Sequence, residues 1–190
     1  VFAAWAVTDN ANPRGIKIGL DKGKRTLILD TGGSSLWDQG GAWFVAHCWG
    51  SSGSADYTLE KFESTQLYTA EISVEHSSVV FARVQKDKEL DKDWKNIWNK
   101  TSDLTIPDDK DTYKITGWDS GDKICPGTWT THTCVYGAES KINNVDPTCE
   151  TAGSYDMTST CKICGDVKTV HYEVDALGHD YSFDYDIIEK

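Results

Sequence analysis

The sequence predicts an all-β protein, built as an antiparallel β-sandwich with a small cysteine-rich β-hairpin module after it. Helix formers are scarce, and one methionine accompanies eight tryptophans and eight tyrosines, whereas β-branched and aromatic residues are those that strands favour. Short alternating segments recur about every ten residues with turn signals between them, as in sandwiches and barrels. Five of the six cysteines stand from residue 125 onward, where the composition changes.

The expected elements follow one another along the first two thirds of the chain. Residues 1–25 are expected to form a leading strand and a loop, with turns at 13–15 and 21–23. Strands are then expected at 25–30, 42–49, 66–72, 78–84, 104–106 and 113–117, and an irregular segment at 57–62. The long charged connection 85–101 carries Trp94 and Trp98, which argue against disorder. Their spacing also fits one helical turn packed on the sheet.

The strand at 42–49, Ala-Trp-Phe-Val-Ala-His-Cys-Trp, is the centre of the prediction. Its side chains alternate between two faces. Ala42, Phe44, Ala46 and Cys48 form an apolar face suited to a core, with Cys48 as a buried free thiol. The other face carries Trp43, Val45, His47 and Trp49. This second face is either buried under a loop or a stacking surface for a ligand with an apolar side and a hydroxyl rim, such as a sugar.

Composition divides the chain into two parts, residues 1–120 and 121–190. The second part is expected to hold a hairpin, with arms at 155–161 and 167–174 and residues 162–166 at its tip. At the start, Ala4-Trp5-Ala6 fits either the remnant of a cleaved export signal or an ordinary first strand. The acidic-aromatic end is expected to lead into further domains of the same polypeptide. Cysteine-rich composition and the signal-like start favour a secreted or cell-surface protein.

Charge and motifs exclude several function classes. The net charge of −11 argues against nucleic acid as a partner, because no basic patch offsets the repulsion from phosphates. No segment is long and apolar enough for membrane insertion. The sequence lacks the nucleophile, metalloprotease and phosphate-loop motifs of common enzymes, and acidic residues are too many for any carboxylate pair to indicate a glycosidase. We therefore expect a non-enzymatic protein.

Several segments, taken together, resemble carbohydrate-binding module family 26, a starch-binding β-sandwich. The most specific match is Trp94–Pro107, which is similar to the family's pattern of two tryptophans followed by Thr-x-Asp-Leu. Weaker matches stand in the family's order at 26–30, 37, 46–50, 57–62 and 79–83, so the resemblance covers about 25–118. It implies an immunoglobulin-like or jelly-roll-like sandwich that binds starch or maltooligosaccharides without catalysis.

The resemblance implies a ligand site made of His47, Trp49, Tyr57, Trp94, Trp98 and Lys100. Indole and phenol rings would cover the apolar sides of the glucose units, and polar side chains would bind the hydroxyls. Two departures from the family stand out. The family's Trp-Pro-Gly is missing, so that Tyr57 would replace an aromatic residue, and Lys100 stands where a glutamine is usual. Trp98 could instead anchor its loop in the core, and His47 could be a structural histidine.

Residues 132–179 resemble short repeats between modules of surface proteins from gut anaerobic bacteria. The matching residues are His132, Thr148-Cys149, Cys161-Lys162-Ile163-Cys164-Gly165 and Gly178-His179. A Cys-x-x-Cys-Gly turn has the geometry of a zinc knuckle, in which Gly165 permits a left-handed bend. Cys161, Cys164, Cys149 and His132 could hold a structural zinc ion, which leaves Cys125 and Cys134 to pair. An all-disulfide module is the competing interpretation.

The main hypothesis is therefore a starch-binding module of a secreted or cell-surface protein. The alternative is a cell-surface adhesion or spacer protein, with an immunoglobulin-like architecture, that binds a protein partner.

Overall fold

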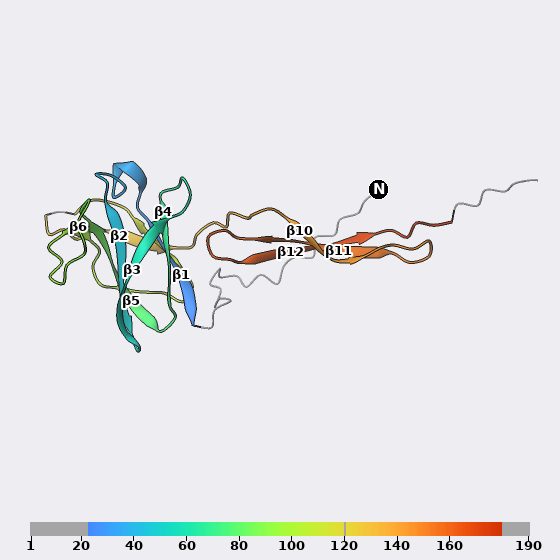
Figure 1. Ribbon diagram of the computed structural model, residues 1–190, viewed down its shortest axis with the longest axis horizontal. Helices are drawn as coiled ribbons and strands as arrows, with labels where there is room; N and C mark the ends of the chain where they lie inside the picture. The colour runs from blue at the N-terminus through green and yellow to red at the C-terminus, as the bar shows by residue number, and fades with distance from the viewer. Residues whose placement is uncertain (1–22, 120, 180–190) are drawn as a thin grey trace, which may run out of the picture. The chain divides into compact units, whose positions relative to one another are not determined.

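A computed structural model describes residues 23–119 and 121–179 of the chain (Figure 1). These residues form two compact units. The sandwich unit contains residues 23–119, 121–135 and 161–166, and the hairpin unit contains residues 136–160 and 167–179. The expected leading strand, the signal-like Ala4-Trp5-Ala6 and the tail beyond residue 179 lie outside the described residues.

The sandwich unit is one large curled sheet of nine strands. Its strands run in the order β6-β5-β2-β3-β4-β1-β8-β9, and β7 also pairs with β5. Among the described residues, β1 and β8 form the sheet's one parallel strand pair, and the other strand pairs are antiparallel. The bounds are β1 Lys24–Asp30, β2 Trp43–Gly50, β3 Gly53–Lys61, β4 Leu67–Ser73, β5 His76–Val84, β6 Ile97–Lys100, β7 Leu104–Thr105, β8 Thr112–Ile115 and β9 Gly127–Thr130, with a short 3-10 helix, η1, at Gly33–Ser35.

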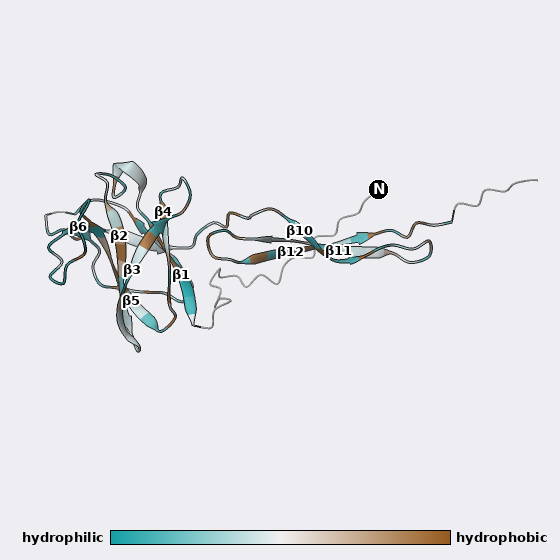
Figure 2. Cartoon of the chain, viewed as in Figure 1, coloured by the Kyte–Doolittle hydropathy of each residue, from teal (hydrophilic) through white to brown (hydrophobic). Residues whose placement is uncertain are grey.

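The curled sheet encloses one main core. Side chains point alternately to the two faces of each strand, and hydrophobic and hydrophilic segments are interspersed along the strands of this unit (Figure 2). On β2, Phe44, Ala46 and Cys48 are fully buried and Ala42 packs against them, so the predicted core face of this strand is confirmed. The other buried members of this core are Leu27, Leu29, Trp37, Leu59, Tyr68, Ile72, Val79, Phe81, Ile106, Tyr113, Ile115 and Cys125.

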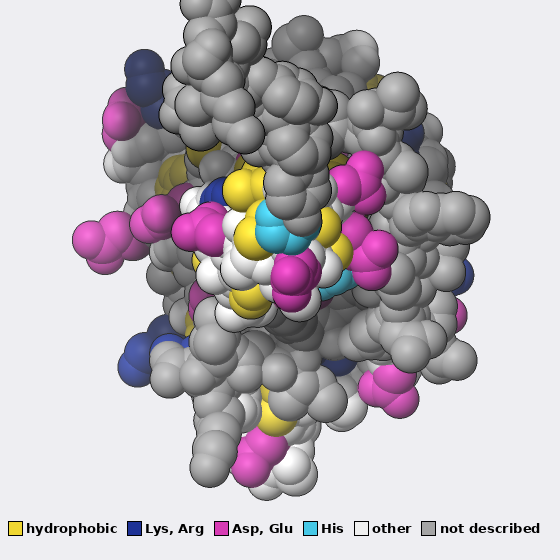
Figure 3. All heavy atoms as spheres, turned by 90° about the vertical axis from the view of Figure 1, so that its right-hand side faces the viewer, with side chains coloured by type: hydrophobic (Ala, Val, Ile, Leu, Met, Phe, Trp, Pro, Cys, Tyr) yellow, Lys and Arg dark blue, Asp and Glu magenta, His cyan; other side chains and the backbone are white. Residues whose placement is uncertain are grey.

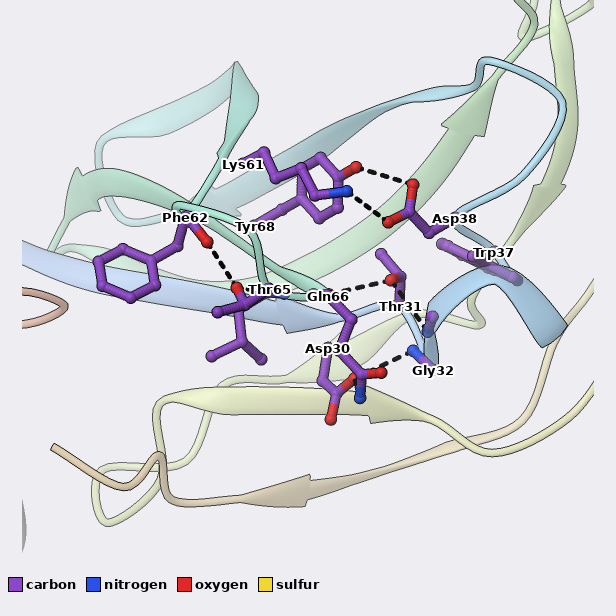
Figure 4. A network of polar contacts seen from close by, with 12 residues as sticks. Asp30, Thr31, Gly32, Trp37, Asp38, Lys61, Phe62, Thr65, Gln66 and Tyr68 are labelled. Carbon is purple, nitrogen blue, oxygen red and sulfur yellow. Dashed lines mark hydrogen bonds and ion pairs between the residues drawn. The ribbon is translucent and has the colours of Figure 1, made fainter. Parts of the chain in front are cut away.

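Polar contacts fix the connection between β1 and β2 (Figure 4). Asp38 accepts hydrogen bonds from Lys61 Nζ at 2.7 Å and from the Tyr68 hydroxyl at 3.0 Å. At the start of the same connection, the Asp30 carboxylate accepts a hydrogen bond from Gln66 Nε2 at 2.7 Å. These bonds tie the connection to β3 and to the start of β4, and they hold the loop that carries the buried Trp37 indole.

Residues 57–62 are not the irregular segment that the sequence predicts, because most of them belong to β3. The strand begins at Gly53, whose φ of 97° suits glycine in the tight turn after β2. Tyr57 and Leu59 of β3 point into the main core, and this burial makes the segment a strand. Polar residues separate Ala55, Tyr57 and Leu59, and this alternation is the pattern of a half-buried strand, so the sequence did carry the signal.

The hairpin unit is a three-stranded antiparallel sheet. β10 (Ser140–Val145) pairs with β11 (Gly153–Thr160), which pairs with β12 (Val167–Val174), so the predicted hairpin is confirmed. Tyr155 and Tyr172 lie opposite each other and stack with their ring centroids 5.1 Å apart. Most side chains of this unit are exposed or half-buried, and Figure 3 shows acidic, histidine and apolar side chains mixed on the face that it draws.

The two units do not divide at residue 120, where the sequence analysis places the boundary. The first unit continues to Val135, because β9 pairs with β8 along Gly127–Thr130. The hairpin tip, residues 161–166, also belongs to the sandwich unit. No helix among the described residues has the length and hydropathy needed to cross a membrane.

Candidate functional site

Four of the predicted ligand residues lie together on the outer side of the curled sheet. The His47 ring lies 5.7 Å from the Trp49 ring and 5.6 Å from the Trp94 ring, measured between centroids. Lys100 Nζ lies 5.8 Å from the centroid of the Trp94 ring. All four side chains are half-buried. We call this set, His47, Trp49, Trp94 and Lys100, the aromatic face.

Strand alternation and a small apolar cluster support the aromatic face. On β2, His47 and Trp49 point away from the main core because the residues between them, Ala46 and Cys48, point into it. A second cluster of buried side chains lies on this outer side, and the half-buried Trp94 packs against it. The buried members of this cluster are Val45, Ala82, Val84 and Ile97.

Asp91 fixes the loop that presents Trp94. Its carboxylate accepts hydrogen bonds from the backbone N–H groups of Asp93, Lys95 and Asn96. These bonds lower the pKa of Asp91, and the bond from the Lys95 N–H has the largest effect. The turn leaves Trp94 at a φ of 57°, a left-handed conformation that is unusual for a bulky residue. Sequence analysis missed Asp91, although an aspartate that bonds to following N–H groups is a common turn signal.

A carboxylate orients His47. His47 Nδ1 lies 2.6 Å from Asp56 Oδ1, on the neighbouring strand directly opposite. This contact places the proton of the neutral ring on Nδ1 and leaves Nε2, on the other edge of the imidazole, as an acceptor. Asp56 was not among the predicted residues, because the pairing of β2 with β3 decides which acid faces His47.

Tyr57 and Trp98 do not join the aromatic face. Tyr57 pairs with Ala46, so its ring lies on the core side of the sheet, and its hydroxyl bonds to Nε2 of the buried His76 at 3.0 Å. Trp98 lies under the Arg83 guanidinium, whose carbon is 4.5 Å from the ring centroid. Trp98, on β6, therefore packs against a side chain of the neighbouring strand β5, and it is half-buried.

A second cluster of functional groups, which we call the thiol–imidazole cluster, consists of His132, Cys134, Cys161 and Cys164. Their four candidate ligand atoms all lie within 4.8 Å of one another, so the cluster could hold a metal ion. His132 Nε2 is 3.5 Å from Cys134 Sγ and 3.5 Å from Cys161 Sγ, and Cys134 Sγ is 4.0 Å from Cys164 Sγ. All four residues belong to the sandwich unit.

The spacing of the thiol–imidazole cluster fits a tetrahedral ion. Bonds of about 2.3 Å to sulfur and about 2.0 Å to nitrogen, set at tetrahedral angles, separate two sulfurs by roughly 3.8 Å and a sulfur from a nitrogen by roughly 3.5 Å. The observed separations, 4.0 Å and 3.5 Å, differ from these values by a few tenths of an ångström or less. Three thiols and one imidazole are also a common ligand set of structural zinc sites.

The turn at the hairpin tip brings two of these thiols together. Cys161 N donates to Asp166 O at 2.6 Å, and Gly165 N donates to Cys161 O at 2.8 Å. Gly165 adopts a φ of 75°, so the left-handed bend expected for this glycine is confirmed. Ile163, between the two cysteines, is buried against Ile28 of β1 and anchors the tip.

Cys134 takes the place in this cluster that the sequence analysis gives to Cys149. Cys149 is exposed and lies in the hairpin unit, so it is not among the four clustered residues. Cys125 is not paired with Cys134, because it is buried in the main core, in a different cluster of side chains. The expected burial of Cys48 as a free thiol is confirmed.

The thiol–imidazole cluster favours one thiolate. Burial raises the pKa of Cys161, but hydrogen bonds with Cys134, His132 and backbone N–H groups outweigh burial and bring that pKa to about 6. Burial, with Cys161 as a neighbour, raises the pKa of Cys164 to about 12. Burial also lowers the pKa of His132, yet the hydrogen bond to Asp111 leaves it above its usual value. A nucleophilic sulfur is thus already stabilised where a cation would bind.

Comparison with family models, with curated proteins and with solved structures finds no match to this chain. The resemblances to a starch-binding module and to a surface repeat therefore stay predictions from the sequence.

Proposed function

We propose that the sandwich unit binds starch and related α-1,4-glucans without catalysis, as part of a secreted or cell-surface protein. The observation that supports this proposal best is the aromatic face. Its four residues come from two strands and a loop, and all of them were candidates on sequence grounds. Only Trp49 and His47 are close in the sequence, so a common role in binding explains why the fold gathers them on one half-exposed surface.

The chemistry of the aromatic face suits a sugar chain. Glucose units present C–H groups on one side, which indole rings cover at little entropic cost. The rings of His47 and Trp94 are set at 85° to each other, so a ligand on this face meets rings in more than one plane, as a curved amylose chain requires. His47 Nε2 and Lys100 Nζ are available as partners for hydroxyl groups that lose water on binding.

A polar cavity adjoins the aromatic face through Asp56. It measures about 410 Å³, within the usual size range of ligand pockets. Hydroxyl and carboxylate groups from three neighbouring strands dominate its lining, and both can bond to sugar hydroxyls. The side chains with these groups are Thr26, Asp56, Thr58, Glu60, Thr69 and Glu71.

The test is to remove the rings one at a time. Trp94→Ala and Trp49→Ala should each weaken maltoheptaose binding by about 1–3 kcal/mol, roughly 5- to 150-fold, because each removes a stacking surface. Titration calorimetry measures the affinity, and retardation in an amylopectin-containing native gel provides an independent readout. Trp118→Ala is the matched control, since Trp118 is 42% exposed and outside the aromatic face. Unchanged affinity in both folded variants would refute this site.

We propose further that the metal of the thiol–imidazole cluster is zinc in a structural role. All four ligands would come from the protein, which closes the coordination sphere and leaves no position for a substrate. Such an ion would join residues 132–134 to the hairpin tip and would supply folding free energy to this part of the sandwich unit.

Metal analysis of two cysteine variants tests the zinc proposal. Protein purified without chelators should carry one zinc ion per chain. Cys134→Ser should lose it, whereas the matched variant Cys149→Ser should retain it, because Cys149 lies outside the cluster. A metal-free wild-type protein with a Cys134–Cys164 disulfide in its peptide map would refute the zinc proposal and favour the disulfide alternative.

A further inference from the structure

Asp111 is a buried carboxylate next to the thiol–imidazole cluster, although no ligand pattern includes it. Its side chain is 5% exposed, and that of its partner His132 is 1% exposed. One carboxylate oxygen, Oδ2, accepts a hydrogen bond from His132 Nδ1 at 2.6 Å. The other, Oδ1, accepts from the His132 backbone N–H at 3.0 Å and from the Thr112 hydroxyl at 2.8 Å.

These bonds determine the state of the imidazole. Because Nδ1 donates its proton to Asp111, the lone pair of the neutral ring lies on Nε2. Nε2 lies 3.5 Å from Cys134 Sγ and 3.5 Å from Cys161 Sγ, at the position a metal ligand would take. A carboxylate that holds a ligating histidine in this way fixes its tautomer and ring orientation and makes it a stronger base.

The backbone of Asp111 joins the same site to the sheet. Its carbonyl accepts a hydrogen bond from the Ile28 amide at 2.9 Å, where β1 and β8 run parallel. The Ile28 side chain is fully buried against Cys161 and Ile163. Asp111 and Ile28 therefore each contact a candidate metal ligand, and they also bond to each other where β1 and β8 pair.

We propose that Asp111 is a positioning residue of the metal centre and that it couples metal binding to the parallel β1–β8 pair. This inference rests on the proposed zinc site. Asp111 does not contact the ion. It aligns His132 for binding through its side chain and holds β1 through its carbonyl, so that a bound ion stabilises the β1–β8 pair as well as the hairpin tip.

The decisive variant is Asp111→Asn, which keeps the shape but loses the charge and the second acceptor oxygen. Loss of such a partner typically weakens metal binding about 10- to 100-fold, and competition with a chromophoric chelator measures the change in zinc affinity. The matched control is Asp108→Asn, an exposed acid three residues away, which should leave zinc affinity unchanged.

A second readout separates positioning from a general structural role. In the zinc-bound wild type, nitrogen NMR should show His132 protonated on Nδ1, and cobalt(II) should give the absorption of a tetrahedral thiolate site. In Asp111→Asn we expect a shifted cobalt spectrum and a changed Nδ1 signal. Wild-type zinc affinity, cobalt spectrum and histidine signals in this variant would overturn the inference, whereas a wild type that binds no zinc would overturn the zinc proposal itself.

Hydrogen exchange keeps the coupling testable if Asp111→Asn does not fold. In the wild type, zinc should slow exchange of the Ile28 amide about tenfold or more, because opening this bond requires the Asp111 segment to move. Zinc should slow exchange of the Ala46 amide, which lies on β2, by a smaller factor. An Ile28 amide that exchanges at the same rate with and without zinc would overturn the coupling.

Discussion

At the scale of the residue, Tyr57 shows how one position in a strand decides a role. It was a candidate ligand residue because the resemblance to a starch-binding module implies an aromatic residue near this position. The register of β2 with β3 pairs it with Ala46, on the core side. Asp56, one position earlier, pairs with His47 and reaches the aromatic face instead. A shift of one residue moves every side chain of a strand to the other face.

Tyr57→Phe should therefore affect stability and leave glucan affinity unchanged. The variant removes the bond to His76 Nε2, and His76 is 4% exposed with its other ring nitrogen, Nδ1, already lacking a hydrogen-bond partner among the described residues. An unpaired buried polar group costs about 1–3 kcal/mol. Urea unfolding measures this loss in the free energy of unfolding, and calorimetry with maltoheptaose measures the affinity.

Trp94→Ala is the reciprocal comparison for Tyr57→Phe. Trp94 is half-buried over the small outer cluster, so its removal should cost affinity more than stability. If Tyr57→Phe lowered the affinity for maltoheptaose tenfold without destabilising the fold, the Tyr57 ring would belong to the ligand site. The assignment of Tyr57 to the core would then be wrong.

The thiol–imidazole cluster marks another limit of sequence reasoning at this scale. The Cys-x-x-Cys-Gly spacing selected Cys161 and Cys164, and the resemblance to surface repeats added His132. The fourth member depends on which chain segment lies beside the hairpin tip, and that is Cys134. The available signal for Cys134 was its spacing of two residues from His132. The repeat-like pattern pointed to Cys149 instead.

At the scale of the element, strands with strong apolar alternation were predictable. The predicted segments at 25–30, 42–49, 66–72, 78–84 and 113–117 correspond to β1, β2, β4, β5 and β8, with ends within about two residues of those observed. In each of these strands, several of the buried residues are β-branched, aromatic or leucine, so strand propensity and the apolar pattern both predict a strand.

Elements with weak patterns were missed. β6 lies inside the charged connection 85–101, and it forms because Ile97 is buried in the outer cluster and the strand pairs with β5. β9 lies beyond residue 120, where no strand was expected before residue 155, and it forms by pairing with β8. β10 is exposed along its whole length, so no burial marks it in the sequence. Partner strands rather than local preference define these three elements.

At the scale of the whole molecule, the net charge lets the salt dependence of binding distinguish the proposed function from its alternative. The chain carries a net charge of −11, whereas a glucan is neutral. An adhesion protein of this charge would attract basic protein partners over distances comparable to the Debye length, about 10 Å at 0.1 M salt. Such an association weakens as salt rises, while stacking on indole rings does not depend on ionic strength.

Maltoheptaose affinity should therefore be nearly independent of salt. We expect the dissociation constant to change by less than about twofold between roughly 0.05 M and 0.5 M sodium chloride, a range in which the Debye length falls from about 14 to 4 Å. Calorimetry at both concentrations measures it, and Trp94→Ala should lower the affinity by the same factor at each. If glucan affinity fell tenfold at high salt with Trp94→Ala without effect, charge rather than the aromatic face would hold the ligand, because screening acts on ion pairs and leaves the stacked indole contact unchanged.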